Sequence, residues 1–151
     1  MPTPETRAQV LRLRKLEERA ARRMVEVRRG ETARARERLI EAERARAAVQ
    51  TRLDRPATLG RTIAQLQRDE RYRAAERTRL AGAEALRRKA ARAQVQAETA
   101  LETARRELEQ ALRVRQASES LDRALRREAD RKRARRDQRA AEELTRPKAR
   151  R

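Results

Sequence analysis

The chain has 151 residues, of which 44% are charged and only 1% aromatic, and its formal net charge is +19. Leu, Ile and Val together make up about 15% of the residues, which is too little apolar material for a globular core at this length. Cysteine and histidine are absent, which excludes disulfides, thiolate metal sites and a histidine general base.

The composition favours long helices over disorder. Ala, Glu, Lys, Leu and Arg make up about 70% of the chain, which is typical of long helices and coiled coils. These residues are also strong helix formers, and the helix breakers are scarce, with three glycines and four prolines.

The first predicted helix covers residues 4–54. Thr3 can cap its N terminus, and Pro4 suits the first helical position, where a missing N–H costs nothing. Apolar residues follow three-and-four spacing in two stretches: Val10, Leu13, Leu16, Ala20, Met24 and Val27, then Ala35, Leu39, Ala42, Val49 and Leu53. The two stretches are out of phase across Gly30, which predicts a stutter in the heptad repeat.

A break then separates two helices. The segment LDRPATLGRT, residues 53–62, contains Pro56 and Gly60 and has the composition of a turn. Thr62 and Gln65 fit a capping box at the start of the next helix. Since a short connection makes consecutive amphipathic helices antiparallel neighbours, residues 55–61 are predicted to form the tip of a hairpin.

The second predicted helix covers residues 62–145 and is followed by a basic tail, residues 146–151. Its apolar seam is clearer and is interrupted at Arg87, Gln94, Arg115 and Asp122. The seam consists of Leu80, Ala83, Ala90, Ala97, Leu101, Ala104, Leu108, Ala111, Ser118, Leu125 and Ala129. The predicted fold is all-α: one domain, a long two-helix antiparallel coiled-coil hairpin whose second helix is longer than the first.

The unequal helix lengths predict an overhang. Folding back near residue 57 would place Val10 opposite Ala104 and leave the second helix without a partner beyond about Ala111. Residues 112–151 contain fifteen Lys/Arg and seven Asp/Glu, a net charge of +8. We expect this basic overhang to contact another molecule.

No motif indicates catalysis. The sequence has no phosphate-binding glycine loop and no candidate triad, and its acidic residues stand at helical spacing beside arginines, as on a solvated face. We therefore expect no enzyme activity, no cofactor and no metal. No apolar run approaches the roughly 18 residues of a membrane span, and no apolar signal core is present, so we expect a cytoplasmic protein without membrane insertion.

Two surfaces are candidate binding sites. The first is an apolar group at the tip with Tyr72 as its aromatic anchor. Tyr72 could instead fill a gap in the seam. This tip group comprises Val49, Leu53, Leu59, Ile63, Leu66 and Tyr72. The second is a basic group at the end of the second helix, which would bind a partner. Its alternative interpretation is a solvated helix end, since cations are favoured at a helix C terminus. The basic group comprises Arg123, Arg126, Arg127, Arg131, Lys132, Arg133, Arg135, Arg136 and Arg139.

A basic helix could also contact nucleic-acid phosphates. Asp137, Ala140 and Ala141 resemble part of a leucine-zipper basic region, but Asp137 stands where that motif has a base-reading asparagine, and no zipper follows. One tyrosine cannot supply the stacking platforms of single-strand binders. Specific binding is therefore not expected. Nonspecific nucleic-acid binding and a structural spacer, either one extended helix or a homodimer, stay open as alternatives.

The chain length, the apolar-sparse hairpin broken near residue 57 and the charged ending EADRKRARRDQRAAEEL resemble the central-stalk proteins of bacterial type III secretion, the FliJ/YscO family, and its injectisome members in particular. The resemblance implies a non-enzymatic protein at the cytoplasmic face of the secretion apparatus. Its terminal end would insert into the hexameric secretion ATPase. Its tip would contact the cytoplasmic domain of the export gate, and it would bind export chaperones. We expect the protein to be a monomer.

Overall fold

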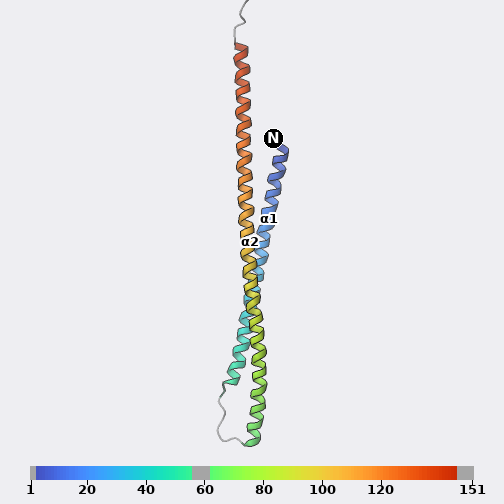
Figure 1. The fold of residues 1–151 in the computed structure, drawn as a ribbon, viewed down its shortest axis with the longest axis vertical. Coiled ribbons are helices and arrows are strands. Elements are labelled where there is room, and N and C mark those ends of the chain that lie inside the picture. Colours follow the sequence, from blue (N-terminus) through green and yellow to red (C-terminus); the bar gives the residue numbers. More distant parts are fainter. Residues whose placement is uncertain (1–2, 56–61, 146–151) are drawn as a thin grey trace, which may run out of the picture. The chain divides into compact units, whose positions relative to one another are not determined.

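The computed structural model describes residues 3–55 and 62–145. Two helices account for nearly all of them: α1, Pro4–Leu53, and the longer α2, Ile63–Thr145 (Figure 1). Both helices lie within one residue of their predicted bounds, and no strand occurs among the described residues. The predicted tip from Pro56 to Arg61, including Leu59 and Gly60, and the predicted basic tail 146–151 lie outside the described residues.

Both helices begin at the predicted caps. The Thr6 N–H donates to Thr3 Oγ1 at 3.2 Å, and the Arg7 N–H donates to the Thr3 carbonyl at 3.1 Å. At the start of α2, the Thr62 N–H donates to Gln65 Oε1 at 2.9 Å, which is the reciprocal bond of a capping box. Local chemistry therefore fixes where each helix starts.

The contacts divide the chain into two compact units, each containing part of both helices. Unit 1 comprises Met1–Arg22 and Glu107–Arg151, and unit 2 comprises Arg23–Arg106. Within each unit, the numbers of paired residues rise on α1 as they fall on α2, so the helices are antiparallel. The pairs are Arg7–Asp122 and Glu18–Arg115 in unit 1, and Arg36–Glu98, Arg46–Glu84 and Arg52–Glu76 in unit 2. The predicted antiparallel two-helix fold is confirmed.

The seam of α2 is the predicted one. Its buried and half-buried residues recur at three-and-four spacing and include every predicted apolar and polar seam position from Leu80 to Leu125. The last predicted position, Ala129, is exposed. Along α2 the alanine and leucine spacing alone was sufficient to identify the buried face.

The seam of α1 agrees with the prediction only in its second half. Ala35, Leu39, Ala42, Val49 and Leu53 are buried or half-buried as predicted. The earlier predicted positions are exposed, with large side chains that are 41% to 58% accessible: Val10, Leu13, Leu16, Met24 and Val27, together with Ala20. The buried face instead contains Arg7, Leu11, Arg14, Glu18, Ala21, Val25, Arg28 and Thr32.

The predicted stutter at Gly30 is wrong. Val25, Arg28, Thr32 and Ala35 are all buried or half-buried, and their three-and-four spacing passes Gly30 without interruption. The error arose because most of the large aliphatic residues in the first part of α1 lie off the seam, whereas the seam there includes polar residues such as Arg7 and Glu18, which pair with side chains of α2.

The predicted register is also wrong. The pair Arg7–Asp122 places the region of Val10 near Leu121 instead of Ala104, and Pro4 lines a cavity together with Arg133. The segment of α2 without a partner therefore starts after Arg133, not after Ala111. The prediction assumed a symmetric turn near residue 57, but among the described residues the cross-helix ion pair nearest the break joins Arg52 to Glu76.

Candidate partner-binding surfaces

In unit 1, each of two buried seam carboxylates contacts two arginines. Glu18 contacts Arg22 of its own helix at 2.6 Å (Oε1 to Nη2) and Arg115 of α2 at 2.9 Å (Oε2 to Nη1). Asp122 contacts Arg126 at 2.8 Å and Arg7 of α1 at 3.3 Å. Glu18 and Asp122 are only 4% and 8% accessible, so their charges need these partners.

Unit 2 repeats this arrangement. Fully buried Glu76 contacts Arg79 on its own helix and Arg52 of α1, the latter at 3.0 Å. Glu84 contacts Arg46 of α1 at 3.4 Å and Arg88 at 3.7 Å. We call each such set of one carboxylate, one arginine of the same helix and one of the other helix a clamp. In each clamp two arginines share one carboxylate, and in the Glu18 clamp Arg115 also contacts Glu119 at 3.7 Å.

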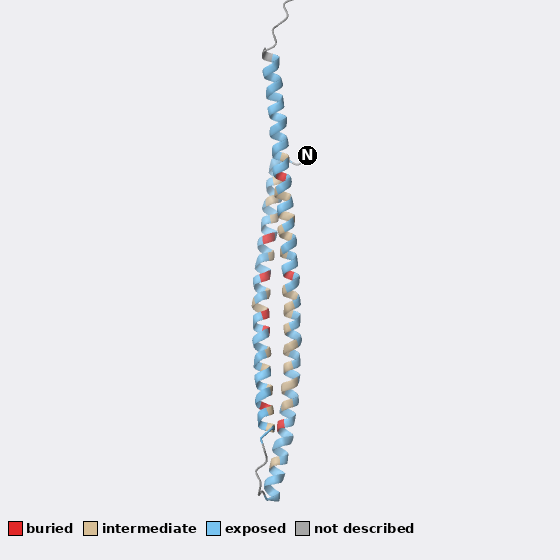
Figure 2. Ribbon diagram, turned by 90° about the vertical axis from the view of Figure 1, so that its left-hand side faces the viewer, coloured by how far each residue is buried: buried red, intermediate tan, exposed pale blue. Residues whose placement is uncertain are grey.

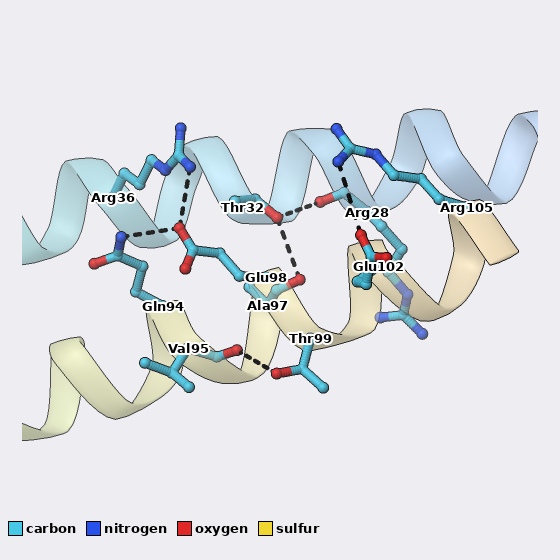
Figure 3. A network of polar contacts seen from close by, with 10 residues as sticks. All are labelled: Arg28, Thr32, Arg36, Gln94, Val95, Ala97, Glu98, Thr99, Glu102 and Arg105. Atoms are coloured by element: carbon cyan, nitrogen blue, oxygen red, sulfur yellow. Dashed lines mark hydrogen bonds and ion pairs between the residues drawn. The ribbon is translucent and has the colours of Figure 1, made fainter.

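A hydrogen-bond network in unit 2 adds to the clamps (Figure 3). Buried Thr32 places its hydroxyl 2.8 Å from the Arg28 carbonyl and 3.3 Å from the Ala97 carbonyl of the other helix. One turn along, Arg36 donates to Glu98 at 3.0 Å, and Gln94 donates to the same oxygen at 3.1 Å. Such directional contacts fix which residues of the two helices face each other.

Hydrogen bonds from arginines lower the pKa of two carboxyl groups in unit 2, those of Glu76 and Glu98. Burial alone would raise the pKa of Glu76, but hydrogen bonds from Arg52 and Arg79 and their positive charges outweigh it, so the pKa is lowered. The pKa of Glu98 is lowered chiefly by the Arg36 hydrogen bond and next by that of Gln94. These groups therefore act as structural anions and not as proton donors at neutral pH.

The predicted tip group does not form one exposed cluster. Val49 is buried at 7% accessibility and Leu53 is half-buried, so both belong to the seam. Ile63 and Tyr72 are exposed, but nine residues of helix place them on opposite sides of α2. Tyr72 lies on the same face as Glu76, one turn earlier. Leu66 is also exposed, and Leu59 lies outside the described residues.

The predicted basic group at the end of α2 is exposed throughout (Figure 2). Three of its members interact within α2: Arg126 with Asp122, Lys132 with Glu128 at 2.7 Å, and Arg123 with the Glu119 carbonyl. The other six make no ion pair with a described residue: Arg127, Arg131, Arg133, Arg135, Arg136 and Arg139. Their charges are therefore available to a partner.

The sequence prediction missed a groove in unit 1. It encloses about 150 Å³ and is lined mainly by the apolar side chains of Val10, Leu11, Leu121 and Leu125, together with Thr6, Arg7, Ser118 and Asp122. The sequence held a partial signal for this groove. Leu11 and Leu125 stand at seam positions of the heptad repeat, as the clamp residues do, whereas the neighbouring Val10 and Leu121 are aliphatic residues outside the seam. We call this the unit 1 groove.

Two further classes of site, metal sites and membrane spans, are absent from residues 3–55 and 62–145. Within these ranges no group of three His, Cys, Asp or Glu could hold a metal ion, and neither helix has a stretch apolar enough to cross a membrane. Unit 1 therefore carries two exposed surfaces, the basic end of α2 and the apolar unit 1 groove. No protein-family model, curated protein or solved structure matches the chain.

Proposed function

We propose that this protein is a non-enzymatic stalk and escort component of a bacterial type III secretion apparatus, acting at its cytoplasmic face, and that the end of α2 enters the ring of the hexameric secretion ATPase. The observation that carries this proposal is the exposed basic end of α2. Beyond Arg133 the helix continues without α1 beside it, and it presents arginines that folding does not use (Figure 1). Unpaired cations at an exposed helix end suit an acidic surface.

The clamps of unit 1 give this end a defined support. Asp122 ties α2 to Arg7, close to the start of α1, about three helical turns before the segment that projects beyond Arg133. In this proposal the exposed tip residues Ile63, Leu66 and Tyr72 contact the export gate or export chaperones. These contacts with the export gate or chaperones would be binding contacts, which require no catalytic group.

The test is the ATPase activity of a co-encoded hexameric secretion ATPase. We expect the intact protein to raise its turnover. Reversing three charges (Arg135→Glu, Arg136→Glu and Arg139→Glu) should lower this stimulation of turnover by a factor of about ten or more. The helical content should stay unchanged because all three side chains are exposed.

A matched control reverses three exposed arginines of α1 that also make no ion pair with a described residue: Arg34→Glu, Arg38→Glu and Arg44→Glu. Both triple variants have the same net charge, so a loss confined to the α2 variant assigns the effect to that end. Equal losses, or no stimulation by the intact protein, would contradict the proposal. Tight nucleic-acid binding with a steep salt dependence would instead favour a phosphate-binding role for the same arginines.

A further inference from the structure

One cavity of unit 1 is lined mainly by cations. It encloses about 350 Å³, and its lining residues are Lys15, Glu18, Arg19 and Arg22 of α1 with Arg115 of α2. The four residues of α1 stand at i, i+3, i+4 and i+7, so they share one face of that helix. We call this the basic cavity. Because four cations line it against one carboxylate, its electrostatic field attracts an anion.

The carboxylate of the basic cavity holds two of the arginines in place. Glu18 is 4% accessible, and its Oε1 lies 2.6 Å from Arg22 Nη2 while its Oε2 lies 2.9 Å from Arg115 Nη1. A guanidinium group has several N–H donors, so each arginine keeps donors that Glu18 does not use. An anion that binds there avoids part of the cost of ordering these two side chains, because folding already holds them.

The other two cations of the basic cavity are not neutralised by folding. Lys15 and Arg19 are exposed, and neither makes an ion pair with a described residue. Arg115 also contacts Glu119 at 3.7 Å, which is beyond hydrogen-bond distance, and its Nε has no hydrogen-bond partner among the described residues. When Glu119 is counted, four cations face two carboxylates, a net charge of +2. A ligand can therefore neutralise charge that the chain itself leaves unpaired.

The lining selects linked phosphate groups over other anions. Arginine and lysine are the residues that bind phosphate oxygens. No aromatic or aliphatic residue lines the cavity, so it has no platform for a nucleobase or another apolar group. Lys15 and Arg22 stand seven residues apart, which is about 10 Å along α1 and longer than one tetrahedral anion. A diphosphate spans more of this distance and carries more negative charge than a single phosphate.

We propose that the basic cavity is a binding site for a diphosphate group, either free or as the tail of a nucleotide. Lys15, Arg19 and the remaining donors of Arg22 and Arg115 bind the phosphate oxygens, and Glu18 holds the two arginines in position. The site uses different residues from the basic end of α2 and does not depend on the secretion role proposed above.

The test is isothermal titration calorimetry of the full-length protein with inorganic diphosphate. We expect a Kd of about 0.1 mM or tighter at about 0.1 M salt, and binding at least about tenfold weaker for inorganic phosphate. ADP should bind as tightly as inorganic diphosphate because the lining contacts only phosphates, and tighter binding of ADP would identify a nucleotide as the source of the group. Equal binding of phosphate and diphosphate, or no measurable binding of diphosphate, would overturn the proposal.

Matched variants locate the site. Lys15→Glu with Arg19→Glu should weaken diphosphate binding about tenfold or more. The control, Lys89→Glu with Arg92→Glu, reverses the same two charges in unit 2, where these residues line a hollow to which α1 contributes no residue. It should change the Kd by less than about twofold, because the Debye length screens charges outside the cavity.

Both variants should keep the helical content of the wild type, because all four substituted side chains are exposed. Equal losses of binding in the two variants would show that the overall positive charge attracts the anion. A single-stranded oligonucleotide that binds through Lys15 and Arg19 where diphosphate does not would show that the cavity binds a nucleic-acid backbone. Either result overturns the proposal.

Discussion

At the scale of single residues, burial in this protein follows pairing more than hydrophobicity. Among the described residues the buried apolar side chains are Val25, Ala35, Val49 and Ala104, and an equal number of polar ones are buried with them: Glu18, Thr32, Glu76 and Asp122. A buried carboxylate is tolerated only where the partners repay its desolvation. Here each buried carboxylate has two arginines, and the threonine has two carbonyls.

Val25 and Val27 offer a matched test of the seam on α1. Val25 is 4% accessible and Val27 is 55% accessible, although Val27 belongs to the stripe predicted from the sequence. Val25→Ala should lower the free energy of unfolding by about 1.5 kcal/mol more than Val27→Ala, because two buried methyl groups are lost. The gain in helix propensity is common to both variants. Urea denaturation measures the difference, and equal effects would show that the seam is misplaced.

The lowered pKa of Glu76 makes stability depend on pH in the acid range. In the unfolded chain this carboxyl has its ordinary pKa of 4.5, and in the folded chain the pKa is lower. The stabilisation is therefore complete above pH 4.5 and is lost as the pH falls through the folded pKa.

We expect the melting temperature, followed by circular dichroism, to be level near neutral pH and to fall below pH 4.5. Glu76→Gln should melt below the wild type at neutral pH, and this difference should shrink in acid. A difference that stays constant over the whole pH range would mean that the ionised form of Glu76 does not support the fold.

At the scale of helices, the sequence was sufficient for the helix bounds and for one of the two faces. Thr3 and Gln65 locate the helix starts by local hydrogen bonding, which needs no knowledge of distant residues. The seam of α2 was predictable because Leu and Ala occupy it at regular spacing. On α1 the largest aliphatic residues, such as Leu13 and Leu16, lie outside the seam, so a rule based on hydrophobicity alone selected the wrong face.

Register was not predictable from the break in the chain. A turn fixes which helices are neighbours, but the offset between them is set by which side chains can pair across the seam. Glu76 with Arg52 and Glu18 with Arg115 define that offset, and neither pair is distinguishable in the sequence from the many Glu and Arg residues on the outer faces. The sequence correctly predicted a basic end of α2 that extends past α1. The structure places the start of this segment after Arg133 and not after Ala111.

A double-mutant cycle tests the register. Glu18→Ala and Arg115→Ala should each destabilise unit 1, and the two effects should be non-additive by about 1–2 kcal/mol because each removes the same pair. As the control, the same Glu18→Ala change combined with Arg92→Ala, which has no contact with Glu18, should be additive within about 0.5 kcal/mol. Additivity for the first pair would contradict the ion pair at 2.9 Å.

At the scale of the whole molecule, little apolar surface becomes exposed on unfolding. Only four apolar residues are buried among those described, and the leucines of the seam, such as Leu80, Leu101 and Leu108, are only half-buried. Because the urea m-value scales with the surface exposed, we expect a value near or below the lower end of the usual range of about 1–3 kcal/mol per molar urea. Equilibrium unfolding by circular dichroism measures it, and a value near the upper end would imply a larger core.

The scarcity of buried aliphatic groups has a thermal consequence. The heat capacity change of unfolding comes mainly from hydrating apolar surface, and a fold held by clamps offers little of it. A small heat capacity change flattens the curve of folding free energy against temperature, so cooling weakens the fold little and warming melts it over a wide interval. The folded fraction of such a protein therefore changes little between low and moderate temperatures. In a protein with a large apolar core, the folding free energy instead has a sharp maximum at one temperature.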